Sequence, residues 1–166
     1  ETIRAGASIA NGGYLVTPHV VKEINYRVGL DKNVEPAKGA RVLKEDTALQ
    51  VTRMLINNVD TSLLDGKAKN PRYSVGAKTG TAQLVSKGSS GYAEDQYLHS
   101  FIGFLPAYNP KFIVFLYTVN PRGVNYASET LAKPFIELTK YLINYYQIPP
   151  DRGMGDVVNG TSTKSI

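Results

Sequence analysis

The 166-residue sequence contains no cysteine and no run of 18 apolar residues. The lack of cysteine excludes disulfides, thiolate nucleophiles and thiolate metal sites. Without a long apolar run, and without a basic, apolar and small-residue pattern after Glu1, the chain is expected to carry neither a membrane anchor nor an export signal of its own. No cluster of side chains indicates a metal site, and no cofactor is expected.

Charge of one sign is not concentrated anywhere in the chain. Nineteen Lys and Arg residues against 14 Asp and Glu give a formal net charge of +5, but the basic residues are scattered and form no run of five. This pattern does not support nucleic-acid binding. A mild positive excess suits an enzyme that acts on an anionic polymer, and a solvated surface explains it equally well.

The length fits one domain, which at this size buries roughly 70% of its surface. Apolar spacing predicts three helices, four strands and two loops. The helices are expected at 2–11, 45–59 and 127–146, the strands at 20–28, 73–84, 97–105 and 112–119, and the loops at 29–41 and 85–96. The last strand is apolar on both faces, which indicates cover on both sides. We expect the domain to occupy 1–150 and a disordered tail to occupy 151–166.

The run Lys78-Thr79-Gly80-Thr81 is the most informative motif, because it places a cation, two hydroxyls and a glycine together on a predicted strand. Together these groups can bind a carboxylate through charge-assisted hydrogen bonds. A phosphate-binding loop is a poor alternative, since Pro71 stands where its first glycine is needed and Ala77 separates Gly76 from Lys78. An ordinary solvated edge strand is the second alternative, because Lys and Thr are common at sheet edges.

Three sequence segments, in the same order along the chain as in a known family, support a resemblance to that family. Lys-Thr-Gly is the third motif of penicillin-binding proteins and serine β-lactamases. The run Gly-Ala-Lys-Thr-Gly-Thr-Ala-Gln at 76–83, the run Ser-Phe-Ile-Gly-Phe-Leu-Pro-Ala-Tyr-Asn-Pro-Lys at 100–111, and Ala-Asn-Gly-Gly at 10–13 followed by Pro18 resemble the C-terminal part of class B, FtsI-type penicillin-binding proteins of cell division. The resemblance spans about residues 1–150, with Ala127-Ser128 replacing the usual glycine pair.

The resemblance implies an α+β fold, an antiparallel sheet with flanking helices, like the C-terminal section of the penicillin-binding and serine β-lactamase transpeptidase fold. It implies a parent enzyme, a serine-type peptidoglycan D,D-transpeptidase that cross-links stem peptides and binds penicillin. Thr79 and Thr81 would bind the terminal carboxylate, Lys78 would add charge and orient a serine, and the Thr81 N–H would stabilise the oxyanion. Gly80 would let the substrate approach the strand.

The nucleophile of this chemistry is absent. The sequence contains no Ser-x-x-Lys, and Thr161-Ser-Thr-Lys164 has the spacing but begins with Thr. His19 and His99 have no acid partner at a telling spacing, so both are interpreted as solvated or structural, and Glu94-Asp95 as a solvated pair. We expect the nucleophile-bearing part of the domain to lie outside this chain, and the chain alone to be inactive.

The implied partners are peptidoglycan stem peptides ending in D-Ala-D-Ala, β-lactam antibiotics, the missing N-terminal half of the domain and cell-division proteins. The implied location is the extracytoplasmic face of the bacterial membrane, with an anchor upstream of Glu1. A non-catalytic penicillin-binding sensor or scaffold of the same fold is the alternative. A serine β-lactamase would share Lys-Thr-Gly but would explain the strings after Ser100 poorly.

Overall fold

The computed structural model describes residues 1–35, 37–86, 88 and 91–153. Its elements follow the chain in the order α1 (Thr2–Ala10), β1 (Tyr14–Val16), β2 (Glu23–Ile24), β3 (Lys32–Asn33), β4 (Lys38–Arg41), α2 (Glu45–Asn57), the π-helical turn η1 (Asn58–Ser62), β5 (Gly76–Val85), β6 (Tyr92–Leu105), β7 (Phe112–Val119) and α3 (Ala127–Tyr145).

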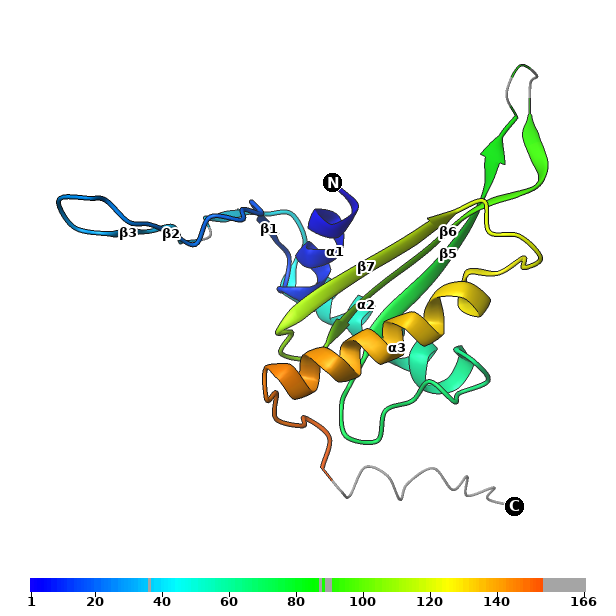
Figure 1. The fold of residues 1–166 in the computed structure, drawn as a ribbon. Coiled ribbons are helices and arrows are strands. Elements are labelled where there is room, and N and C mark those ends of the chain that lie inside the picture. Colours follow the sequence, from blue (N-terminus) through cyan, green and yellow to red (C-terminus); the bar gives the residue numbers. More distant parts are fainter. Residues whose placement is uncertain (36, 87, 89–90, 154–166) are drawn as a thin grey trace.

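The main sheet is antiparallel and has the order β5-β6-β7, so β6 is its central strand. Helix α3 crosses one face of this sheet, and α1 and α2 cover the other (Figure 1). This arrangement confirms the predicted α+β class with an antiparallel sheet and flanking helices.

Alternation along β6 sends side chains to the two faces in turn. Phe101 is fully buried and packs against Phe135 of α3, with 4.5 Å between the ring centroids. Phe104 points the other way, into a cluster with Ile56 of α2 and Ile113 of β7. The sheet therefore has apolar cover on both faces, as the sequence of 112–119 predicts.

The three predicted helices are present with small differences at their ends. Helix α2 buries Ala48, Thr52 and Ile56 and begins after Lys44 without a side-chain cap, and it passes into η1 instead of ending at 59. Helix α3 continues through Pro134, which lies in its second turn.

Predictions for three non-helical segments are wrong, and two of these segments lie between α1 and α2. The predicted strand 20–28 contains only the two residues of β2, and the predicted loop 29–41 contains β3 and β4. The alternation of apolar and polar residues at 20–28 predicted a half-buried strand, but the apolar side chains face solvent, and Val28 is 92% exposed. Strands β2 and β3 form a hairpin that projects from the body (Figure 1), whereas β4 pairs with β1.

The predicted loop 85–96 also contains strand residues at both of its ends. Strand β5 runs to Val85, which pairs with Tyr92 at the start of β6. Tyr92 and Val85 are exposed, so this part of the hairpin is held by backbone pairing and leaves no buried face to be seen in the sequence.

Candidate functional site

The motif residues Lys78 to Thr81 lie in β5, which pairs only with β6 within the described residues. Strand β5 is thus an edge strand of the described sheet, with β6 beside it. An edge strand presents unpaired backbone groups that an extended peptide can join as an added strand.

Register divides the motif between the two faces of the sheet. Thr79 lies opposite Phe101 and Thr81 opposite His99, on the face that α3 covers. Lys78 lies opposite Ile102 and Gly80 opposite Ser100, on the face of α1 and α2. The two hydroxyls therefore share one face, and the ammonium belongs to the other.

Lys78 is exposed, and its Nζ donates to the carbonyl of Thr79 at 2.7 Å. Lys78 forms no ion pair within the described part of the chain. Its charge is thus available to an external anion or to a side chain from another polypeptide segment.

Gly80 lies close to the side chain of Ser100 on the adjacent strand. A Cβ built at Gly80 would lie 2.6 Å from Ser100 Oγ, which itself donates to the Gly80 carbonyl at 3.4 Å. This contact within the fold favours glycine at position 80, in addition to the expected approach of a substrate. The clashing atom ends a short side chain that can rotate, so the conflict is modest.

Thr81 joins β5 to the start of α3. Its Oγ1 accepts a hydrogen bond from the backbone N–H of Ala127 at 3.1 Å. Ala127 is the first residue of α3, and its N–H is one of those that a helix cannot satisfy internally. The Thr81 hydroxyl therefore keeps its own hydrogen for donation to another acceptor.

His99 is fully buried between β6 and α3. Its Nδ1 lies 3.0 Å from the Thr130 hydroxyl, and its Nε2 has no hydrogen-bond partner among the described residues. The structure thus agrees with a structural role for His99 and excludes a solvated one. Thr81, His99, Ala127 and Thr130 are called the His99 cluster below, and no motif in the sequence marks it.

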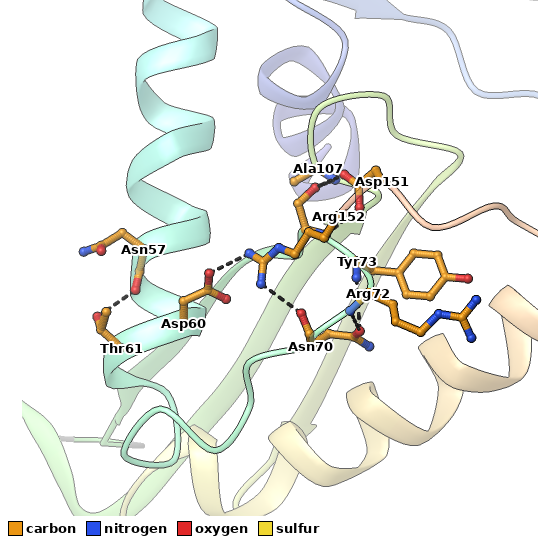
Figure 2. A network of polar contacts seen from close by, with 10 residues as sticks. Asn57, Asp60, Thr61, Asn70, Arg72, Tyr73, Ala107, Asp151 and Arg152 are labelled. Atoms are coloured by element: carbon orange, nitrogen blue, oxygen red, sulfur yellow. Dashed lines mark hydrogen bonds and ion pairs between the residues drawn. The ribbon is translucent and has the colours of Figure 1, made fainter. Parts of the chain in front are cut away.

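The entry to β5 is held by a second set of polar contacts, made by residues after 150. Both carboxylate oxygens of Asp151 contact Ser74, one accepting from its N–H at 2.7 Å and the other from its hydroxyl. The guanidinium of Arg152 donates to the Asn70 carbonyl at 2.8 Å and pairs with Asp60 (Figure 2). These five residues are called the C-terminal clasp below.

The clasp corrects the predicted tail. The Ser74 hydroxyl also accepts the N–H of Ala107 at 2.8 Å, so Asp151 is tied to the turn between β6 and β7 (Figure 2). Residues 151 and 152 belong to the folded body because of these contacts. The rest of the predicted tail, with Thr161 and Lys164, lies outside the described residues apart from Gly153.

Neither a metal site nor a membrane span is found in the described part of the chain. No group of three or more His, Asp or Glu side chains gathers there, and no helix there combines the length and apolar character needed to cross a bilayer. His19 is exposed and lies near backbone carbonyls of Thr17 and Val34.

Comparison with known families assigns the chain to a class. The sequence model of the penicillin binding protein transpeptidase domain matches residues 1–139. The chain therefore belongs to the family of penicillin-binding protein transpeptidase domains.

Two curated proteins illustrate the similarity of the chain to members of this family. The chain is 33% identical over 141 residues to Stage V sporulation protein D of Bacillus subtilis, covering 82% of this chain and 21% of that protein. It is 36% identical over 80 residues to peptidoglycan D,D-transpeptidase FtsI of Buchnera aphidicola, covering 48% and 14%. The chain thus spans about a fifth or less of these two relatives.

A solved structure agrees with this assignment. Penicillin-binding protein 3 of Mycobacterium tuberculosis, complexed with ampicillin, superposes with a TM-score of 0.74 at 26% identity. The match covers 94% of this chain and 36% of that chain. The described fold is therefore that of part of a transpeptidase domain.

Proposed function

We propose that the chain is the C-terminal section of a serine D,D-transpeptidase domain, and that β5 binds the substrate carboxylate. The supporting observation is the open edge of β5, where Thr79 and Thr81 share a face and Lys78 has no carboxylate partner within the described residues. We call the longer protein that contains this section the parent protein.

In the proposed reaction a serine of the parent protein attacks the penultimate D-alanine carbonyl of a stem peptide. The serine oxygen forms an ester, the peptide C–N bond breaks, and the departing D-alanine amine takes a proton. An amine of a neighbouring stem peptide then attacks the ester and releases the serine. Such acyl transfer needs an activated nucleophile, oxyanion donors and a holder for the terminal carboxylate.

In the proposal, this chain supplies an oxyanion donor and the groups that hold the terminal carboxylate. The hydroxyls of Thr79 and Thr81 donate to the carboxylate from one face of the sheet. Lys78, whose side chain leaves β5 on the other face, reaches round the open edge of the strand, where it adds positive charge and orients the serine. The Thr81 N–H is one oxyanion donor. Gly80 keeps the strand open to the substrate. The nucleophile comes from the N-terminal half of the domain, which also provides a neighbour for β7, since β7 pairs only with β6 within the described residues.

Extracytoplasmic location, anchoring through a segment upstream of Glu1, and contact with cell-division proteins follow from the proposal for the parent protein. β-Lactams would enter the same site because they imitate the D-alanyl-D-alanine end. The isolated chain is expected to form no adduct with penicillin, whereas the parent protein should be acylated. Stoichiometric acylation of the isolated chain in a mass spectrum would place the nucleophile within it and contradict the proposal.

The direct test of the carboxylate site is Thr81→Val in the parent protein. A hydrogen bond to a charged group contributes about 1.5–3 kcal/mol, so the second-order acylation rate with benzylpenicillin should fall about 10- to 150-fold. Thr81→Ser keeps the hydroxyl and should retain most of the rate. Thr139→Val, which alters a buried threonine elsewhere on α3, is the control. Equal rates for Thr81→Val and the unchanged protein would remove Thr81 from the site.

A further inference from the structure

The His99 cluster connects the motif strand to α3 through one peptide group. Ala127 donates its N–H to Thr81 Oγ1 at 3.1 Å, and its carbonyl accepts from the Thr130 hydroxyl at 3.3 Å. His99 Nδ1 lies 3.0 Å from the same hydroxyl. The first turn of α3 is therefore held from two adjacent strands, because Thr81 and His99 are opposite each other in β5 and β6.

The directions of these hydrogen bonds follow from the hydrogens available. A threonine hydroxyl has one hydrogen, and that of Thr130 is donated to the Ala127 carbonyl. With this donation assigned, the Thr130 oxygen accepts from His99, and the assignment places the His99 hydrogen on Nδ1. The order of donation runs from His99 to Thr130 to Ala127, whose N–H in turn donates to Thr81.

This order leaves His99 Nε2 as an acceptor that lacks a partner among the described residues, in a fully buried side chain. A buried polar atom without a partner lowers stability, and an apolar side chain of similar volume would avoid that cost. Each such atom in a native structure calls for a reason. Among the described residues, the His99 side chain is hydrogen-bonded only to Thr130, in the helix turn that also binds Thr81.

We propose that His99 is a positioning residue for the Thr81 hydroxyl, acting through Thr130 and Ala127. The inference rests on the proposed role of Thr81 in binding the substrate carboxylate. With Ala127 fixed, its N–H occupies an acceptor position of Thr81 Oγ1 and turns the hydroxyl hydrogen toward an acceptor outside the fold. The hydroxyl is then oriented before the carboxylate arrives, so no orientational freedom is lost on binding.

The consequence concerns recognition of one group, the carboxylate, and leaves the acyl-transfer machinery alone. We therefore expect His99 to influence how strongly the parent protein prefers a free carboxylate over an ester. Benzylpenicillin and its methyl ester share the β-lactam ring and differ in that group. The ratio of their second-order acylation rates, called the acid/ester ratio here, measures the preference.

The experiment compares variants of the parent protein by this ratio. His99→Leu and Thr130→Val should each lower it about 3- to 10-fold, the size of an ordinary coupling between contacting residues. His99→Asn should restore most of it, because the Asn Nδ2 amide can donate to Thr130 from near the position of Nδ1. Thr139→Val is the matched control: the Thr139 hydroxyl also donates to a helix carbonyl three residues earlier in α3, at 3.0 Å.

A double-mutant cycle with Thr81→Val tests whether His99 acts through Thr81. In the Thr81→Val background, His99→Leu should change the ratio by less than about 1.5-fold, because the hydroxyl that it orients is gone. An undiminished effect there would overturn the inference. If His99→Leu does not fold, Thr130→Val carries the same cycle.

The outcomes also separate this inference from the function on which it rests. If Thr81→Val lowers the ratio and both His99→Leu and Thr130→Val leave it unchanged, the positioning role is wrong and the carboxylate site stands. If Thr81→Val itself leaves the ratio unchanged, the carboxylate site and the positioning role are both overturned.

Discussion

The two polar clusters around β5 differ in charge and in what they connect. The C-terminal clasp lies at the entry to the strand and uses charged groups, since Asp60, Asp151 and Arg152 all take part. The His99 cluster lies beside the motif and uses only an imidazole, hydroxyls and a backbone amide. The clasp connects segments that are distant in the sequence, whereas the His99 cluster includes Thr81, a residue of the proposed site.

Each cluster also leaves one buried atom without a partner among the described residues, Asp60 Oδ1 in the clasp and His99 Nε2 in the other. The consequences differ because the other oxygen of Asp60 forms an ion pair with Arg152. Removing one partner of a buried ion pair leaves the other charge unpaired, whereas the His99 cluster contains no ion pair within the described residues. We therefore expect the clasp to determine stability and the His99 cluster to determine recognition.

The largest expected effect is that of Arg152→Ala. Arg152 and Asp60 retain only 12% and 18% of their side-chain exposure, so the change leaves a largely buried carboxylate and the Asn70 carbonyl unpaired. We expect the transpeptidase domain of the parent protein to lose about 3 kcal/mol of its free energy of unfolding in a denaturant titration.

The control for Arg152→Ala is Lys133→Ala, which breaks an exposed pair with Glu137 at 4.0 Å. That pair should contribute less than about 0.5 kcal/mol. If the two variants lose similar amounts of stability, the clasp is no stronger than a surface ion pair and the comparison fails.

An intermediate effect is expected for Ser74→Ala. The change removes a hydroxyl that donates to Asp151 and accepts from Ala107, while the Ser74 carbonyl still accepts the Ala107 N–H at 2.9 Å. We expect a loss of about 2 kcal/mol in thermal or chemical unfolding, with the acid/ester ratio unchanged. Ser62→Ala, at an exposed position in η1, is the control. A lowered ratio would show that the clasp also acts on recognition.

The sequence predicted those parts of the fold that bury an apolar face. Helices α2 and α3 and the strands around Phe101 and Val114 follow from such patterns, because burial imposes a period on the sequence. The ends of β5 and β6 near Val85 and Tyr92 were missed since exposed hairpins need no such period. The hairpin of β2 and β3 was misplaced for the same reason.

The site was predicted unevenly. Lys78 to Thr81 were found because four chemically distinctive residues are consecutive. Thr130 and Ala127 were not, since the hydrogen bond from Ala127 to Thr81 spans 46 positions. Asp151 and Arg152 were assigned to a tail because composition describes only neighbours in sequence, while Asp151 binds Ser74 across 77 positions. The roles of the motif residues toward a substrate stay predictions.

The smallest expected effect on stability is that of His99→Leu, and it separates the two clusters most sharply. The change removes the hydrogen bond to Thr130, which should cost about 1 kcal/mol, and it also removes the unpaired Nε2, which should return a similar amount. We expect the free energy of unfolding of the parent domain to change by less than about 0.5 kcal/mol. Phe101→Leu is the matched comparison, because Phe101 lies on the same face of β6 and is equally buried. That substitution leaves a cavity and should cost about 1 kcal/mol or more. A loss of stability for His99→Leu as large as that for Ser74→Ala would mean that His99 supports the fold as the clasp does. The positioning role of His99 would then stand only if His99→Leu lowered the acid/ester ratio more than Ser74→Ala does.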